Sequence, residues 1–228
     1  MPSFDFMKTS EVDRTYRVMR VASDFDLSTD KITEHFSGTI DFPENWKIGV
    51  IVGKSGTGKT SIAKQLFPEY ISNGKYTFTH KSVIDDMPES VSMEDITKMF
   101  YAVGFGSVPS WLKPYYVLSN GEKMRVELAR ALLEPENKII LFDEFTSVVD
   151  RDVAYSLCVA LKKAMEHSSK QFIAVSCHYD ILEWLQPDWV FNTDGMTENF
   201  RSARVPQGTS TSGNAGVRNG ANLSVITI

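Results

Sequence analysis

A glycine-rich segment that begins at residue 53 constrains the fold more than any other feature of the chain. An apolar run over Ile48 to Val52, typical of a buried parallel strand, precedes it. A helical pattern containing Ile62, Ala63 and Leu66 follows and stops before Pro68. Glycines between a strand and a helix let the backbone turn tightly and present N–H groups to an anion at the helix N-terminus. We therefore predict a phosphate-binding loop comprising Gly53, Lys54, Ser55, Gly56, Thr57, Gly58, Lys59, Thr60 and Ser61.

Two side chains of this loop have specific expected roles. Lys59 can reach the β- and γ-phosphates of a nucleotide, and the Thr60 hydroxyl can ligate magnesium (Mg²⁺). The alternative is a chance glycine-rich turn. The loop is favoured because the motif, the strand before it and the helix after it all agree.

A second apolar run ends at two acids. Ile139 to Phe142 reads as a strand, and Asp143 and Glu144 follow it directly. Ligands of open parallel sheets bind at the carboxyl ends of the strands. We expect Asp143 to hold Mg²⁺ through water and Glu144 to polarise the attacking water, because phosphoryl transfer needs a metal anchor and a water-orienting group. Two surface acids are the alternative.

The run from Leu118 to Leu132 is, in physical terms, a capped amphipathic helix. Ser119 and Glu122 have capping-box spacing, and an apolar helical stripe follows and ends before Pro135. As a string, however, it closely resembles the signature of ATP-binding-cassette (ABC) ATPases. The matching letters are Leu118-Ser119-Asn120-Gly121-Glu122-Lys123-Met124-Arg125 and Leu128-Ala129-Arg130-Ala131-Leu132.

Two further strings are similar to motifs of the same family. Asp143 to Asp150 resembles its Walker B motif and D-loop, and Ser176 to Asp180 resembles its switch-histidine segment. The resemblance covers roughly residues 14 to 195, with five motifs in the family's order. It implies an α/β P-loop NTPase fold of ABC type, with a parallel-rich central sheet, flanking helices and a reduced helical subdomain.

The resemblance also implies ATP hydrolysis by a head-to-tail homodimer that sandwiches two ATP molecules. Each ATP would contact the phosphate loop of one protomer and Ser119, Asn120, Gly121 and Glu122 of the other. Ser119 and the Gly121 N–H would cap the γ-phosphate in trans. Glu144 would activate water, His178 would contact the γ-phosphate, and Asp150 would communicate across the interface. For His178 the alternative is a hydrogen-bonded surface histidine.

Composition sets the limits of this interpretation. At 228 residues and 42% hydrophobic, the chain can bury the core of one domain, expected over residues 1–200 with a helical lobe at about 88–118. The net charge of -5 gives no nucleic-acid signal. No apolar run approaches about 20 residues, so we expect no transmembrane segment, and Met1 to Ser10 lacks an apolar central stretch, so we expect no signal peptide there. Cys158 and Cys177 are read as reduced thiols, which fits a cytoplasmic location.

The N-terminal region is expected to supply strands and an aromatic side chain that stacks on adenine. Strand-like runs occur around Arg17 to Val21 and Phe36 to Phe42. In the family an aromatic residue upstream of the phosphate loop stacks on adenine, and Phe25 lies at about the right distance. Tyr16 and Phe36 are rivals, and core packing is the alternative for each.

The chain departs from the family pattern between the phosphate loop and the signature. Family members usually carry a glutamine here, but residues 76–86 contain none. Asp85 or Asp86 can stand in as an oxygen near Mg²⁺, with a solvated loop as the alternative. Ser92 with Asp95 predicts the start of one short helix, which Gly104 ends. Such a reduced lobe weakens a transporter assignment.

The C-terminal residues 201–228 are expected to form a flexible tail. Gln207 to Asn222 is a Gly/Ser/Thr/Asn tract, and an alternating apolar string follows it to Ile228. That string is read either as a strand that folds back onto the domain or as one that adds to a partner's sheet.

The predicted function is that of a soluble ABC-type ATPase driving conformational work on an unidentified partner. Three strings, Val108 to Pro114, Asp143 to Arg151 and Phe172 to Asp180, look similar to those of stand-alone cassette ATPases of bacteria and mobile elements, some of which are joined to acyltransferase domains. An acyltransferase is therefore one candidate partner. The alternative is the nucleotide-binding subunit of a transporter with separate membrane chains. A chromosome-maintenance ATPase is disfavoured because Lys59 and Leu118 lie too close in the sequence for long heptad arms.

Overall fold

The protein is built around a parallel five-stranded sheet of order β4-β5-β3-β6-β7. The computed structural model describes residues 3–11, 13–27, 32–72, 75–194 and 224–226. The strands are β3 (Ile48–Val52), β4 (Ile139–Phe142), β5 (Gln171–Ser176), β6 (Trp189–Asn192) and β7 (Ser224–Ile226), and every neighbouring pair is parallel. The predicted α/β fold with a parallel-rich sheet is confirmed.

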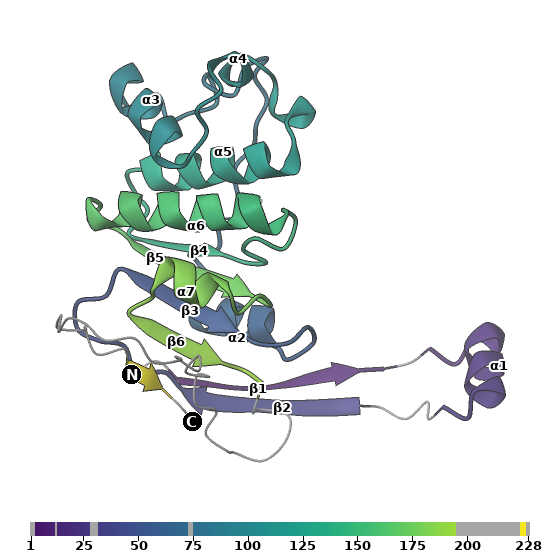
Figure 1. Cartoon of the computed structure of the whole chain (residues 1–228). Helices are drawn as coiled ribbons and strands as arrows, with labels where there is room; N and C mark the ends of the chain where they lie inside the picture. Colours follow the sequence, from purple (N-terminus) through teal and green to yellow (C-terminus); the bar gives the residue numbers. More distant parts are fainter. Residues whose placement is uncertain (1–2, 12, 28–31, 73–74, 195–223, 227–228) are drawn as a thin grey trace, which may run out of the picture.

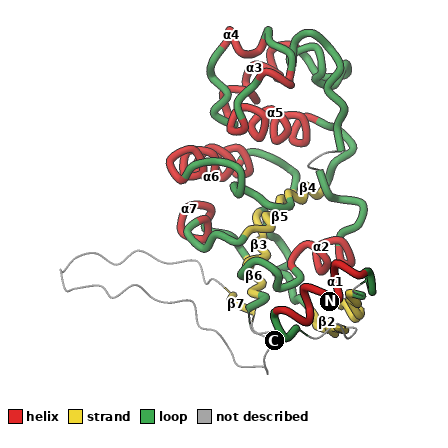
Figure 2. The backbone as a smooth tube through the Cα atoms, turned by 90° about the vertical axis from the view of Figure 1, so that its right-hand side faces the viewer, coloured by secondary structure: helices red, strands yellow, loops and turns green. Residues whose placement is uncertain are grey.

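Helices cover both faces of this sheet. Figure 2 shows α6 (Arg151–Glu166) and α7 (Ile181–Leu185) on one side of the strands and α2 (Lys59–Leu66) on the other. α5 (Asn120–Leu133) lies beyond α6 in Figure 1. The strands are apolar on both faces because both are covered, which explains why β3 is buried at every position.

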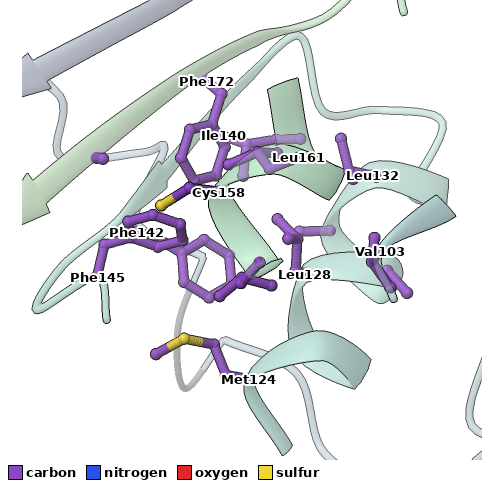
Figure 3. Close-up of a cluster of buried hydrophobic side chains, with 14 of the residues drawn as sticks. Val103, Met124, Leu128, Leu132, Ile140, Phe142, Phe145, Cys158, Leu161 and Phe172 are labelled. Atoms are coloured by element: carbon purple, nitrogen blue, oxygen red, sulfur yellow. The ribbon is translucent and has the colours of Figure 1, made fainter. Parts of the chain in front are cut away.

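Two buried clusters correspond to the two faces. The larger joins the sheet to α5, α6 and the helical lobe, and in Figure 3 Phe142 and Phe172 face Leu128 and Leu161. The smaller lies between the sheet, α2 and the N-terminal strands, and contains Phe36. The phosphate loop therefore begins at a strand that both clusters hold in place.

The helical lobe is small, as predicted. It contains α3 (Met93–Ala102), α4 (Val108–Trp111) and the 3₁₀ helix η1 (Tyr115–Val117). Ser92 caps α3 by accepting from the Asp95 N–H at 3.1 Å, and Gly104 follows the helix with a φ of +77°. Figure 1 shows the lobe stacked beyond α5, at the far end of the molecule from the N-terminal strands.

The N-terminal region differs from the prediction. β1 (Ser3–Ser10) and β2 (Ile32–Thr39) form an antiparallel ribbon, and α1 (Tyr16–Asp24) lies at its far end in Figure 1. The strand expected at Arg17 to Val21 is wrong. Thr15 accepts the Val18 N–H at 3.4 Å and caps a helix whose apolar residues recur every three or four positions.

The C-terminal end returns to the domain. Val190 of β6 is the parallel partner of Val225 of β7, so the apolar string pairs with its own sheet, as one of the two alternatives predicted. The expected domain boundary at residue 200 omits this strand. The linker tract lies outside the described residues. Within the ranges that the structure describes, none of the helices has the length and apolarity needed to cross a bilayer.

Candidate functional site

The glycine-rich segment forms the expected turn between β3 and α2. Gly56 and Gly58 have φ values of +87° and +82°, in the left-handed region that glycine adopts without a steric penalty. Gly58 is also the N-cap of α2. A Cβ atom at Gly58 would lie 2.5 Å from Cε1 of the buried Phe36, so the loop rests directly on that ring.

Part of the loop packs against the end of β6 instead of facing solvent. Thr57 is buried, and its hydroxyl lies 2.5 Å from the Thr193 hydroxyl at the end of β6. The Lys54 N–H donates to Asp194 Oδ1 at 2.6 Å. A Cβ at Gly53 would lie 2.1 Å from Thr193 Oγ1, so only glycine fits there. The carboxyl end of β6 therefore fixes the path of the loop.

The two predicted metal-binding side chains are in contact. The Thr60 hydroxyl, in the first turn of α2, donates to Asp143 Oδ1 at 3.0 Å. The Glu144 N–H donates to the same carboxylate oxygen at 3.0 Å. A hydroxyl and a carboxylate are oxygen ligands of the type that Mg²⁺ prefers in phosphate-binding sites. The residues present therefore fit this metal.

Glu144 has an unusual backbone conformation. Its φ of +52° lies in the left-handed region, which is sparsely populated by residues other than glycine and is frequent at functional sites. Neighbouring contacts hold it there: the Phe145 N–H donates to Val175 O at 2.8 Å, and Ser176 Oγ donates to Phe145 O at 2.9 Å. β5 thus fixes the backbone next to the exposed Glu144 at the strand ends.

A cavity of about 350 Å³ lies over the loop. Ser55, Gly56, Gly58, Lys59, Thr60 and Ser61 line it from the loop side, and Asp143 and Glu144 from the end of β4. The Lys59 ammonium donates to Lys54 O at 2.6 Å. The cavity therefore combines the predicted phosphate, metal and water-activating groups in one place.

His178 lies beside this cavity. The backbone N–H of His178 donates to Ser176 Oγ at 3.1 Å, and the preceding residue, Cys177, lines the cavity. The ring Nδ1 is buried, with no hydrogen-bond partner among the described residues. The imidazole itself is not among the lining groups, so in this conformation it stands next to the phosphate site.

The signature segment forms the start of α5. Ser119 and Glu122 make the predicted capping box: Ser119 Oγ accepts the Glu122 N–H at 3.3 Å, and Glu122 Oε2 accepts the Ser119 N–H at 2.9 Å. The Ser110 hydroxyl donates to Glu122 Oε1 at 2.8 Å. These hydrogen bonds, the one from the Ser119 N–H foremost, lower the pKa of Glu122.

The signature does not join the phosphate loop of its own chain. Among the described residues, those that line the loop cavity do not include Ser119, Asn120, Gly121 or Glu122. Ser119 and Asn120 are exposed instead. Asn120 lines a second cavity of about 270 Å³, which it shares with Glu144.

The structure does not bring Phe25 to the nucleotide cavity. This side chain is 72% exposed at the C-terminal end of α1, it is not among the residues that line the loop cavity, and Figure 1 shows α1 beyond the outer end of the β1–β2 ribbon, away from the sheet. Its rival Tyr16 lies on the same helix, and Phe36 packs beneath Gly58. Tyr16, Phe25 and Phe36 are all absent from the lining of the loop cavity, so the structure does not support the adenine-stacking prediction for any of them.

Neither aspartate of the segment without glutamine lines the loop cavity. Asp86 Oδ1 accepts the backbone N–H groups of Thr79 at 3.0 Å and His80 at 3.1 Å, and the His80 ring Nδ1 lies 2.7 Å away. Asp85 accepts from the Ser82 hydroxyl. The structure therefore favours the connector alternative over a metal ligand.

Several residues near Asp143 and Glu144 were not predicted from the sequence. Lys8 of β1 lines the loop cavity. Tyr115 and Glu127 line the second cavity with Glu144, and the Tyr115 hydroxyl donates to Glu127. Burial raises the pKa of both side chains. A signal was present for Glu127, because it interrupts the apolar residues of the signature helix.

Comparison with known proteins shows the family to which the chain belongs. The model of the family described as "ATPase family associated with various cellular activities (AAA)" matches residues 50–185, and the chain belongs to this family. A relative in Mycoplasmopsis pulmonis, the energy-coupling factor transporter ATP-binding protein EcfA1, is 32% identical over 128 residues, covering 55% of this chain and 42% of the relative. Human ABCB7, a mitochondrial iron-sulfur clusters transporter, is 25% identical over 179 residues, covering 60% and 23%.

Solved structures show the same fold. The dimeric ATP-binding cassette MJ0796 bound to ADP and Pi has a TM-score of 0.58 at 15% identity, covering 85% of this chain and 94% of that one. A bacterial Atm1-family ABC exporter with ATP bound has a TM-score of 0.51 at 19% identity, covering 70% and 34%. The chain spans less than half the length of the curated relatives named above. The ABC-type ATPase domain predicted from the motifs is confirmed, and the narrower similarity to stand-alone cassettes stays a prediction.

Proposed function

We propose that the protein binds and hydrolyses ATP with Mg²⁺ as a head-to-tail homodimer and uses the cycle to do conformational work on a partner protein. The observation that carries this proposal is that Thr60, Asp143 and Glu144 line the cavity over the phosphate loop, while Ser119, Asn120, Gly121 and Glu122 of the same chain do not. A complete site then needs the signature of a second copy.

Within one protomer, each group has a separate role. The loop N–H groups and Lys59 bind the β- and γ-phosphates at the N-terminus of α2, where the helix dipole also favours anions. Thr60 and Asp143 hold Mg²⁺, which neutralises phosphate charge when bound. Glu144, which lines the cavity, orients and polarises the attacking water.

The second protomer supplies the remaining groups. Ser119 and the Gly121 N–H cap the γ-phosphate in trans, with Asn120 and Glu122 completing the segment. The dimeric state of the MJ0796 structure supports this arrangement. A two-fold pairing of this kind buries the same surface on both subunits and closes at two copies.

Two further residues complete the proposed cycle. His178 contacts the γ-phosphate. Its position beside the cavity suits this role, and so does its ring Nδ1, which has no hydrogen-bond partner among the described residues. Asp150 caps α6 by accepting the Val153 N–H at 2.9 Å, so a change at the D-loop reaches a helix of the core. The switch between ATP and ADP states thereby passes from the interface into each protomer.

Mixing two inactive variants tests the proposal. Lys59→Ala removes the phosphate contact, and Ser119→Arg blocks the signature, so each homodimer lacks both working sites. A mixed dimer keeps one intact site, formed by the loop of the Ser119→Arg chain and the signature of the Lys59→Ala chain. We expect ATPase activity to return on mixing. Activity that stays absent in the mixture, although both variants fold, contradicts the trans site.

A transporter subunit is the second candidate function. The relatives named above are transporter proteins or their ATP-binding subunits, and the lobe exposes Met93 at 60% and Tyr101 at 59% on α3. The partner is then a membrane chain, whereas under the first proposal it is another protein in the cytoplasm, for instance an acyltransferase. Affinity capture of the Glu144→Gln variant with ATP, from detergent-solubilised membranes and from the soluble fraction, separates the two.

A further inference from the structure

Lys8 continues the inward face of strand β1. Side chains alternate along a strand, so Phe4, Phe6 and Lys8 share one face. Phe4 is buried, and Phe6 stacks on Phe36 with ring centroids 5.2 Å apart. Met7, on the opposite face, is 71% exposed. Lys8 is itself exposed, and it extends the face of Phe4 and Phe6 beyond the core.

This face of β1 brings Lys8 to the phosphate loop. β1 contacts α2, and Phe36, the ring beneath Phe6, lies against Gly58. Two residues after Phe6, the strand extends beyond the core, and Lys8 lines the loop cavity. Its cross-strand partner on β2, Glu34, is not among the lining residues.

The charges around the cavity indicate what Lys8 does at this position. The charged side chains that line it among the described residues are Lys8, Lys59, Asp143 and Glu144. Without Lys8 the lining would carry one cation against two carboxylates, which opposes the approach of a polyphosphate. Lys8 balances the two signs, and it does so from a different element than Lys59.

We propose that Lys8 is a nucleotide-binding residue whose ammonium contacts the polyphosphate chain of the bound nucleotide, opposite Lys59. This inference rests on the proposed function, because it needs a nucleotide in the loop cavity. A lysine suits this role because it is a flexible point charge with three donors and no acceptor, and it matches phosphate oxygens. Phosphate is favoured over the base because a donor-only cation gains most from a charge-assisted hydrogen bond.

Equilibrium binding to the full chain tests the assignment. We compare wild type, Lys8→Gln, Lys8→Arg and Lys64→Gln by titration with ATP, ADP and AMP. Lys64→Gln is the matched control, because Lys64 is an exposed lysine of α2 that does not line the cavity. Losing one charge-assisted contact should weaken ATP binding by about tenfold in Lys8→Gln. Lys8→Arg should restore most of the affinity, and the control should stay within about twofold of wild type.

The pattern across ligands separates a phosphate contact from a general loss of structure. The weakening should be larger for ATP and ADP than for AMP, and ATP binding should depend less on salt in Lys8→Gln than in the control. Equal ATP affinity of Lys8→Gln and wild type overturns this inference and leaves the proposed function standing. A wild type that binds no ATP overturns both.

Discussion

An alanine at Gly58 should destabilise the protein more than an alanine at Gly56, although both glycines have left-handed backbones. The φ values are +82° and +87°, so each substitution carries the same conformational penalty. Their surroundings differ. A Cβ at Gly56 would meet nothing within 4 Å, whereas a Cβ at Gly58 would lie 2.5 Å from Cε1 and 3.0 Å from Cζ of Phe36.

The expected magnitudes follow from this geometry. A left-handed non-glycine residue costs about 1–2 kcal/mol, which is the whole effect expected for Gly56→Ala. Gly58→Ala should add an overpacking cost of about 1–3 kcal/mol, giving about 2–5 kcal/mol in total. The Phe36 ring cannot swing away freely, because it is 2% exposed and stacked on Phe6.

Equilibrium urea unfolding of both variants measures the difference in the free energy of unfolding. Phe36→Leu provides a double-mutant test, since the smaller side chain makes room for the new Cβ. Combined with Gly58→Ala it should lower the free energy of unfolding by less than the sum of the two single changes, while combined with Gly56→Ala it should be additive. Equal losses for the two alanine variants, or additivity at Gly58, would refute the contact between the loop and the ring.

Two other predictions concern the carboxylates near the site. Glu122 has a pKa below its ordinary value of 4.5, so its contribution to stability is present at neutral pH and is lost as the pH falls through the folded-state pKa. Urea unfolding should therefore show wild type losing stability relative to Glu122→Gln in acid, and parallel pH profiles would contradict this. Asp86→Ala should cost about 2–3 kcal/mol of stability through its lost hydrogen bonds, whereas Asp85→Ala should cost under about 0.5 kcal/mol. Neither should change the Mg²⁺ concentration for half-maximal ATPase activity, and a shift in either would revive the metal-ligand interpretation.

The elements around the phosphate loop were predictable because their signals are local. The strand Ile48 to Val52, the helix that Pro68 follows and the capping box of Ser119 and Glu122 each depend on residues within one turn or one strand. The meeting of Thr60 with Asp143 followed from placing both motifs at the carboxyl edge of one parallel sheet.

What failed depended on contacts that chain distance does not reveal. Phe25 was placed by counting residues upstream of Gly53, and the inserted helix α1 makes that count meaningless in space. Asp86 accepts the backbone N–H groups of Thr79 and His80, seven and six residues earlier, and no residue pattern predicts these hydrogen bonds. The position of Lys8 at the loop cavity depends on the pairing of β1 with β2 and on the packing of Phe36 against Gly58, neither of which the sequence pattern reveals.

The mass of the Glu144→Gln variant in ATP tests the central claim most directly. This change keeps the shape of the side chain and removes the base, so ATP should bind and stay unhydrolysed. With ATP and Mg²⁺, light scattering should give a mass near twice the 25.6 kDa monomer. The same variant in ADP, and the Glu144→Gln/Ser119→Arg double variant in ATP, should remain monomeric. A monomeric mass for Glu144→Gln at saturating, measured ATP occupancy would contradict the head-to-tail dimer.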